Sequence, residues 1–206
     1  MPLSADATVL DLGAGTGKLT RVLVARFGRV IAVEPDAAMR ARITVGEPVA
    51  GWAEAIPLAD ASVNGVFAAE AFHWFDWEHA LAEIGRVLVP DGILALLWSR
   101  WEEEDHLLPD GLLPHSSSPK HGAFMSGEWR QAFVDAPFEP FRAYELRQER
   151  DVSREQLVEH FSSVSFVAAL PPAERQEILA RITAALPRPR YRQRWTVCLY
   201  WTRLRS

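Results

Sequence analysis

The sequence predicts an α/β fold in which helices cover a mostly parallel β-sheet. Short apolar runs alternate with amphipathic helical stretches through residues 9–98, which is the pattern of successive strand–helix–strand units. A glycine-rich segment, Gly13–Gly17, separates the first strand from the first helix. The run Ile93–Trp98 is apolar throughout, as expected of a strand that is buried on both faces of a sheet.

The composition predicts one globular domain over residues 1–206. Of the 206 residues, 49% are hydrophobic and 24% are charged, which is enough apolar mass for one core. The formal net charge of −5 disfavours nucleic acid as a partner, because phosphate binding needs a basic face. Cys198 is the one cysteine, which excludes intrachain disulfides and thiolate metal clusters. The sequence contains no leader-like or membrane-spanning segment, so we expect no membrane partner and a cytoplasmic location.

The first half is expected to hold five strands and three helices. The strands are expected at Val9–Leu12, Val30–Val33, Pro48–Ala53, Val63–Ala69 and Ile93–Trp98. The helices are expected at Thr16–Phe27, Asp36–Arg42 and Trp77–Leu88, where apolar residues recur at helical spacing or a capping residue precedes the helix. Pro90-Asp91-Gly92 is expected to stop the third helix.

The second half departs from this alternation. Residues 101–127 are rich in acidic residues, Pro, Ser and His, and we expect them to form a long surface insertion or lid within the domain. Helices are expected near residues 128–134, from a capping box at Ser153, and from Pro171 onward. Strands are expected near residues 138–147 and 194–202, and two such late strands suit a hairpin at the sheet edge.

The glycine segment is compatible with several classes of ligand. Glycines permit positive φ and close approach of a ligand to the backbone, beside the unpaired N–H groups of a helix start. A triphosphate loop is disfavoured because Leu19 stands where a Ser or Thr would hold magnesium. A dinucleotide loop is disfavoured because the third glycine comes one residue early. A turn without a ligand is the plain alternative.

Glu34 supports the binding of a nucleoside. It ends the second expected strand, beside the glycine segment. A carboxylate there can accept hydrogen bonds from both hydroxyls of a ribose. The same geometry serves NAD, so Glu34 does not select one nucleoside cofactor. The alternative is a solvated acid at the end of a strand.

Five segments occur in the order and spacing of a known family: VLDLGAGTGKLT (Val9–Thr20), VIAVEPDAAM (Val30–Met39), GWAEAIPLADAS (Gly51–Ser62), EAFHWFD (Glu70–Asp76) and LVPDGILALLW (Leu88–Trp98). Together they resemble the class I methyltransferases of small molecules that use S-adenosylmethionine (SAM) and are labelled type 11 domains. The Ala-Phe-His-Trp signature resembles the trans-aconitate methyltransferase subgroup. The resemblance implies a Rossmann-like, doubly wound sheet of seven strands whose last strand is antiparallel.

The resemblance also implies a cofactor-binding role for each matched residue. The methionine part of SAM would be cradled by Asp11, Gly13, Ala14 and Gly15, and Glu34 would bind the ribose. Adenine would lie beside Pro35 and Met39 and be bordered by Ala53 and Glu54, while Ala69 and Glu70 would end the fourth strand near the sulfonium. Trp52 departs from relatives that place an acid there, so adenine would rely on stacking or on backbone contacts.

His73 is the candidate catalytic residue. The sulfonium already activates the methyl group, so catalysis can be mostly in-line positioning of an acceptor nucleophile, either a carboxylate or a hydroxyl oxygen of a small molecule. His73 could orient or deprotonate that acceptor. A histidine amid Phe72, Trp74 and Phe75 is equally expected as a packed core residue. No metal site is expected, because the Glu70–His73 pair has no second copy.

The resembling family carries additional helices before its first strand, whereas here the first strand begins near Ala7. Without such helices, apolar surface would be exposed and SAM would bind weakly. An upstream start, a homodimer or the lid are the compensations that we consider. Beside the methyltransferase, three alternatives stay open: a catalytically silent SAM-binding protein, an N-terminally truncated fragment and an NAD-dependent oxidoreductase.

Overall fold

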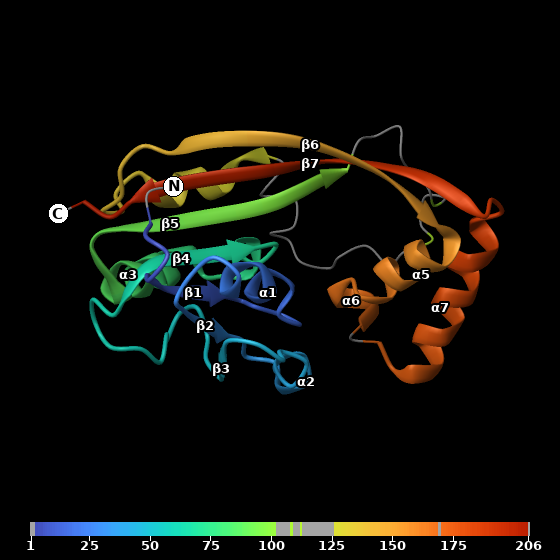
Figure 1. The fold of residues 1–206 in the computed structure, drawn as a ribbon, viewed down its shortest axis with the longest axis horizontal. Coiled ribbons are helices and arrows are strands. Elements are labelled where there is room, and N and C mark those ends of the chain that lie inside the picture. The colour runs from blue at the N-terminus through green and yellow to red at the C-terminus, as the bar shows by residue number, and fades with distance from the viewer. Residues whose placement is uncertain (1–2, 102–107, 109–111, 113–125, 169, 206) are drawn as a thin grey trace. The chain divides into compact units, whose positions relative to one another are not determined.

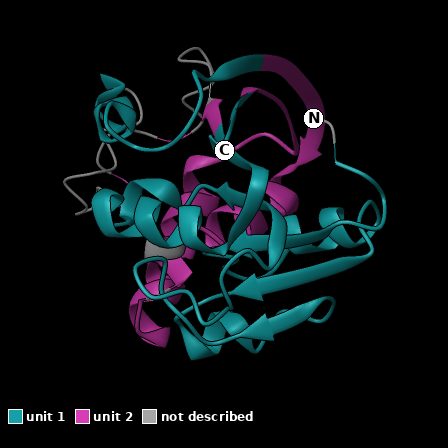
Figure 2. Cartoon of the chain, turned by 90° about the vertical axis from the view of Figure 1, so that its left-hand side faces the viewer, with its two compact units in different colours: residues 1–98, 119–144, 198–206 teal, residues 99–118, 145–197 magenta. Residues whose placement is uncertain are grey.

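The computed structural model describes residues 3–101, 108, 112, 126–168 and 170–205. The expected lid, residues 101–127, falls almost wholly outside these described residues. The chain divides into two compact units, which Figure 2 shows in two colours. Unit 1 comprises residues 1–98, 119–144 and 198–206, and unit 2 comprises residues 99–118 and 145–197.

Among the described residues, seven strands form one sheet in the order β3-β2-β1-β4-β5-β7-β6, with β7 antiparallel (Figure 1). The strands are β1 (Thr8–Leu12), β2 (Arg29–Val33), β3 (Glu47–Val49), β4 (Val63–Ala69), β5 (Leu88–Trp101), β6 (Arg142–Ser153) and β7 (Arg190–Arg203). The pairs β1–β2, β1–β4, β2–β3 and β4–β5 are parallel. The expected α/β fold with a seven-stranded sheet is therefore confirmed.

The central strands bury side chains on both faces of the sheet. In β1, Val9 belongs to an apolar cluster with Leu23 of the first helix, whereas Leu10 belongs to a second cluster with Ile84 of the third helix. Successive strand residues point to opposite faces, so these two helices cover opposite faces. This arrangement confirms the doubly wound architecture and explains why the strands read as continuous apolar runs.

The helical segments of unit 1 are α1 (Lys18–Val24), α2 (Ala37–Arg40), η1 (Phe72–Trp74), α3 (Trp77–Val87) and η3 (Glu128–Phe133). The first helix is shorter than expected, because Gly17 precedes it in a left-handed conformation with φ of +76°. The expected cap of α2 is confirmed, since Asp36 accepts the Met39 N–H at 2.7 Å. The expected helix near residues 128–134 is a 3₁₀ helix.

The fifth strand is longer than expected, because Pro90-Asp91-Gly92 lies inside β5. The register of β4 and β5 shifts between Val63 and Gly65, and Asp91 adopts a positive φ of 61°. Such an irregularity accommodates a proline that a regular ladder would exclude. In contrast, β3 ends at Val49, earlier than the expected Ala53.

Unit 2 contains α5 (Arg154–Ser162), α6 (Ser165–Ala168) and α7 (Pro172–Ala185). The capping box is confirmed, because Ser153 Oγ accepts the Gln156 N–H and Gln156 Oε1 accepts the Ser153 N–H. Its small core is formed by Val152, Leu157, Ile182 and Leu186. Within the described part of the chain, every helix is too short or too polar to span a lipid bilayer.

Candidate functional site

The residues proposed for cofactor binding follow the carboxyl ends of neighbouring parallel strands. Gly13 follows β1, Glu34 follows β2 and Glu70 follows β4. The register pairs Leu12 with Val33 and Asp11 with Phe67, so these strands end at one edge of the sheet. Ligands of open α/β sheets bind outside this edge.

The glycine segment is a loop fixed to the neighbouring strand. The N–H groups of Gly13 and Ala14 both donate to the Val33 carbonyl, at 2.9 and 3.1 Å. Gly13 and Gly15 have φ of +71° and +56°, which L side chains adopt at a cost. A Cβ at Gly13 would lie 2.7 Å from the Cβ of Ala71, whereas a Cβ at Gly15 would have no neighbour within 4 Å. The loop therefore packs tightly at Gly13 and has open space beside Gly15.

Glu34 is held in one orientation by two backbone donors. Its Oε2 accepts the Gly15 N–H at 2.8 Å and its Oε1 accepts the Asp36 N–H at 2.9 Å. The residue is 6% exposed. Each carboxylate oxygen can accept more than one hydrogen bond, so each keeps capacity for a hydroxyl group. A ribose diol fits this arrangement, and the open space beside Gly15 leaves room for a ligand.

Asp11 is buried beneath the glycine loop and is bound by a residue that the sequence analysis missed. The Thr20 hydroxyl donates to Asp11 Oδ2 at 2.6 Å, and both side chains are buried. Burial raises the pKa of Asp11 to about 6, against the opposing hydrogen bond from Thr20, and the charge of Glu34 adds to the rise. A threonine inside an amphipathic helix carries no sequence signal for this bond.

The residues proposed for adenine have different surroundings. Ala53 is buried and Met39 is half-buried, whereas the Trp52 side chain is 63% exposed. Glu54 Oε1 accepts the Asp76 N–H at 2.7 Å. The Glu54 carboxylate thus contacts the residue that precedes α3. Pro35 is half-buried directly after Glu34, and its carbonyl accepts a hydrogen bond from Arg40 at 3.1 Å.

The end of β4 carries a strained backbone position. Glu70 has φ of +52°, although it is not a glycine. Its N–H donates to the Leu97 carbonyl of β5 at 2.9 Å, which holds it in place. Ala69, just before it, is half-buried. Such left-handed non-glycine residues cost about 1–3 kcal/mol and cluster at functional sites.

His73 is 5% exposed, and its ring lies beside that of Trp74, with centroids 5.4 Å apart. We define the aromatic cluster as Phe72, Phe75, Trp77, Trp98, Trp129, Phe133, Phe138, Phe141 and Tyr200, which contact one another through their rings. The Trp98 indole N–H donates to Nδ1 of His73 at 3.2 Å. His73 is therefore buried, as the packing alternative predicted, and it also takes part in a specific hydrogen bond.

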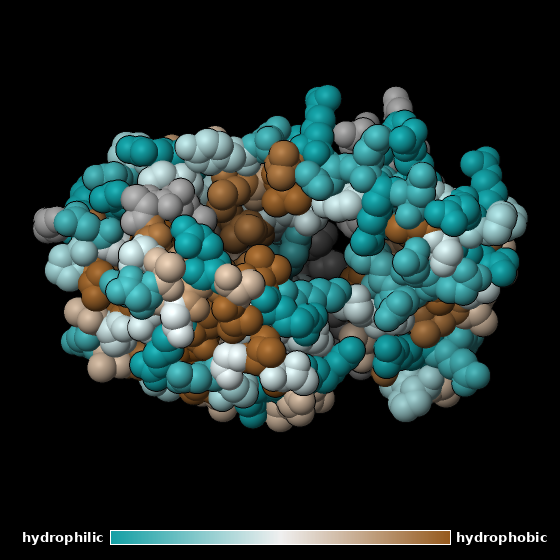
Figure 3. Space-filling model, viewed as in Figure 1, coloured by the Kyte–Doolittle hydropathy of each residue, from teal (hydrophilic) through white to brown (hydrophobic). Residues whose placement is uncertain are grey.

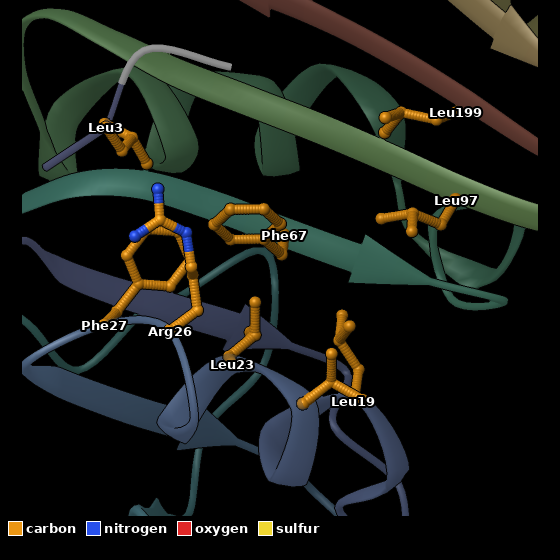
Figure 4. A pocket seen from close by; sticks show the side chains of 9 residues that line it. Leu3, Leu19, Leu23, Arg26, Phe27, Phe67, Leu97 and Leu199 are labelled. Atoms are coloured by element: carbon orange, nitrogen blue, oxygen red, sulfur yellow. The ribbon is translucent and has the colours of Figure 1, made fainter. Parts of the chain in front are cut away.

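An apolar pocket with a volume of about 410 Å³ lies elsewhere on unit 1. Figure 4 shows Leu19, Leu23 and Phe27 facing Phe67 and Leu97 across it. The full lining is Leu3, Leu19, Val22, Leu23, Arg26, Phe27, Phe67, Leu97 and Leu199. Figure 3 shows the apolar surface over α1 and the nearby strands. None of the residues proposed for SAM lines this pocket.

Among the described residues, no group of three His, Cys, Asp or Glu side chains is arranged to hold a metal ion. The carboxyl ends of β1, β2 and β4 instead suit an uncharged diol beside Glu34. The buried carboxylate of Asp11 lies nearby.

Comparisons with known proteins agree with this geometry. A family model of methyltransferase domains, of type 11, matches residues 10–96. An uncharacterized methyltransferase-like protein of Schizosaccharomyces pombe is 34% identical over 194 residues, which cover 87% of this chain and 74% of that protein. A solved structure from Anaeromyxobacter dehalogenans, assigned as a type II methyltransferase, has a TM-score of 0.69 at 27% identity and covers 100% of this chain and 92% of that one.

Other relatives match over shorter segments. An uncharacterized methyltransferase of Mycobacterium tuberculosis is 47% identical over 104 residues, 48% of this chain, and the match spans only 43% of that protein. A trans-aconitate 2-methyltransferase of Azoarcus is 36% identical over 116 residues, which cover 52% of this chain and 46% of that enzyme. With its sheet order, its glycine loop and these relatives, the chain belongs to the class I SAM-dependent methyltransferases with a type 11 methyltransferase domain.

Proposed function

We propose that this methyltransferase moves the methyl group of SAM to an oxygen atom of a small molecule, with a carboxylate as the favoured acceptor. The observation that carries the cofactor half of the proposal is the Glu34 carboxylate, fixed between the Gly15 and Asp36 N–H groups at 2.8 and 2.9 Å. The name of the Azoarcus relative supports the acceptor half, because trans-aconitate is a carboxylate.

On the cofactor side, the residues of the chain would bind and orient SAM. Glu34 would accept hydrogen bonds from the two ribose hydroxyls, and the charge of the buried Asp11 would favour the ammonium group of the methionine part. Gly13, Ala14 and Gly15 would let that part approach the backbone. Pro35, Met39 and Ala53 would lie beside adenine, and the exposed Trp52 offers a ring for stacking.

On the acceptor side, the chain's residues position an oxygen. When bound, SAM supplies a methyl group on a positively charged sulfur, which needs little further activation. The strained Glu70 and its neighbour Ala69 end β4, where we expect the sulfonium to lie. His73, in the next turn, would hydrogen-bond the acceptor, while the aromatic cluster excludes water on its other side. In-line positioning then carries most of the rate.

A thermal-shift comparison tests the cofactor, and a labelled transfer assay tests the reaction. SAM and its demethylated product should raise the melting temperature, whereas NADH should not, because only the native state binds the ligand. Small carboxylic acids and phenols are then screened with methyl-labelled SAM. Stabilisation by NADH alone would refute SAM binding at this edge. Stabilisation by SAM without transfer to any acceptor would favour a silent SAM-binding protein.

A further inference from the structure

The hydrogen bond between Trp98 and His73 fixes which nitrogen of the histidine carries the proton. An indole N–H can only donate, so Nδ1 of His73 must accept with its lone pair. A histidine whose Nδ1 accepts is in the neutral form with its proton on Nε2. The chemical state of the ring thus follows from its partner.

Trp98 is itself held firmly. It lies in β5 and is 2% exposed. Its ring packs edge-on against Phe72, with centroids 6.5 Å apart, and in a tilted arrangement against Trp129, with centroids 5.1 Å apart. Turning the imidazole over would place Cδ2 against the indole N–H and break this buried hydrogen bond, which costs stability. The orientation of the pair is therefore determined by packing and by hydrogen bonding together.

We propose that Trp98 is a positioning residue that keeps His73 neutral and protonated on Nε2, so that His73 meets the acceptor as a hydrogen-bond donor and not as a base. In this form neither ring nitrogen can take a proton from the acceptor, because the Nδ1 lone pair binds Trp98 and Nε2 already carries hydrogen. The part that concerns the acceptor rests on the proposed function, whereas the part that concerns the proton does not.

The proposal explains why the acceptor should be ionised before it binds. A lone pair of a carboxylate oxygen forms the new O–C bond to the methyl group while the C–S bond breaks and its electrons remain on sulfur. No proton is released in this step, so no base is needed. An alcohol would have to lose a proton, and His73 in this form cannot take it.

The first test reads the proton without cofactor or acceptor. In the protein with ¹⁵N-labelled histidine, the Nδ1 of His73 should give a pyridine-type ¹⁵N shift and Nε2 a pyrrole-type shift, with the signals assigned through His73→Gln. In Trp98→Phe the two shifts should approach each other, because both tautomers become accessible. A pyrrole-type Nδ1 in the unmodified protein would overturn the proposal, whether or not the variant folds.

Trp129→Phe is the matched control for Trp98→Phe. Trp129 is 0% exposed in the same aromatic cluster, and among the described residues its indole N–H has no hydrogen-bond partner. The two substitutions remove the same atoms from the same environment, but only one removes the bond to His73. The shifts of His73 should therefore stay separated in Trp129→Phe. Equal changes in both variants would mean that loss of packing, not loss of the bond, moves the proton.

The second test separates a donor from a base by activity. The side-chain amide of His73→Gln can donate a hydrogen bond from about the position of Nε2 but cannot take up a proton, and His73→Ala can do neither. With a carboxylate acceptor found in the screen, His73→Gln should keep about fivefold more activity than His73→Ala, mainly through a lower KM. If His73→Gln is as inactive as His73→Ala while the unmodified protein is active, His73 is not a donor, and the proposal fails.

Discussion

At the ends of β1 and β2 the side chains are fixed by hydrogen bonds, whereas after β4 they are fixed by ring packing. Glu34 is held by two backbone N–H groups and Asp11 by the Thr20 hydroxyl. His73, in contrast, is buried, its ring lies 5.4 Å from that of Trp74, and its Nδ1 accepts the Trp98 indole N–H. The first region suits a cofactor of constant structure, since hydrogen bonds specify their partners. Under the proposed function the second region would bind the acceptor, and changes of its apolar side chains would change which acceptor fits.

The two regions meet at Gly13. A Cβ there would lie 2.7 Å from Ala71 and 3.4 Å from the Phe75 ring, so the glycine loop packs directly on the segment that carries His73. A substitution at Gly13 should therefore perturb both regions, and substitutions elsewhere can perturb each region alone.

The largest effect is expected for Gly13→Ala. The substitution combines a left-handed φ of +71° with a clash against Ala71, and together these should cost about 2–5 kcal/mol of stability. Urea denaturation measures this loss. Gly15→Ala is the matched control, because its φ is +56° but its Cβ meets nothing within 4 Å; it should cost only about 1–2 kcal/mol. Equal losses would show that the contact between the two regions contributes nothing.

The next effect concerns the buried charge of Asp11. The pKa of Asp11 is raised from 3.8 to about 6, chiefly by desolvation. The folded protein therefore holds this proton more tightly than the unfolded chain, so stability from this group is present below pH 4 and is lost as the pH rises through about 6. The free energy of unfolding of Asp11→Asn lacks this term.

Measured against Asp11→Asn, the unmodified protein should lose about 2.4 kcal/mol of relative stability between pH 4 and pH 7. Urea denaturation of both proteins at each pH gives the difference and removes the contribution of all other acids. A constant difference would mean that Asp11 is not desolvated in the folded protein.

These two regions also differ in how far the sequence predicts them. Local patterns predict the features that depend on residues within a single strand–helix–strand unit. These features are the strands β1, β2 and β4, the Asp36 cap and the position of Glu34 beside the loop. The bond between Trp98 and His73 joins residues 25 positions apart, and no periodicity encodes it. Trp129 enters the same cluster from beyond the segment that the structure does not describe.

The limits of the strands show the same distinction. The Pro90-Asp91-Gly92 segment is typical of a break between elements, yet the register shift at Val63 and Gly65 lets β5 continue through it. Likewise β6 is exposed along most of its length and lacks the alternation that marks a half-buried strand. Long strands whose stability comes from their neighbours in the sheet are not visible in their own sequence.

A smaller effect, confined to the carboxyl ends of β1 and β2, is expected for Glu34→Ala. The loss of charge-assisted hydrogen bonds to the ribose should weaken SAM binding at least about tenfold, as measured by calorimetry. Glu47→Ala is a suitable control, because Glu47 is an exposed acid whose partner is Arg29, at 2.7 Å. SAM affinity should be unchanged in Glu47→Ala. If Glu34→Ala also binds SAM normally, the carboxyl ends of β1 and β2 do not bind the nucleoside.

The smallest effect is expected outside both regions, in the apolar pocket beside α1. Val22 lines this pocket and is 65% exposed, so Val22→Glu should change stability by less than about 0.5 kcal/mol. The substitution should lower the binding of a hydrophobic dye, because the apolar surface is interrupted, while SAM affinity by calorimetry stays the same. The pocket shares no lining residue with the site proposed for SAM. The experiment therefore measures whether the two sites are independent. A drop in SAM affinity in Val22→Glu would mean that the pocket also contributes to cofactor binding.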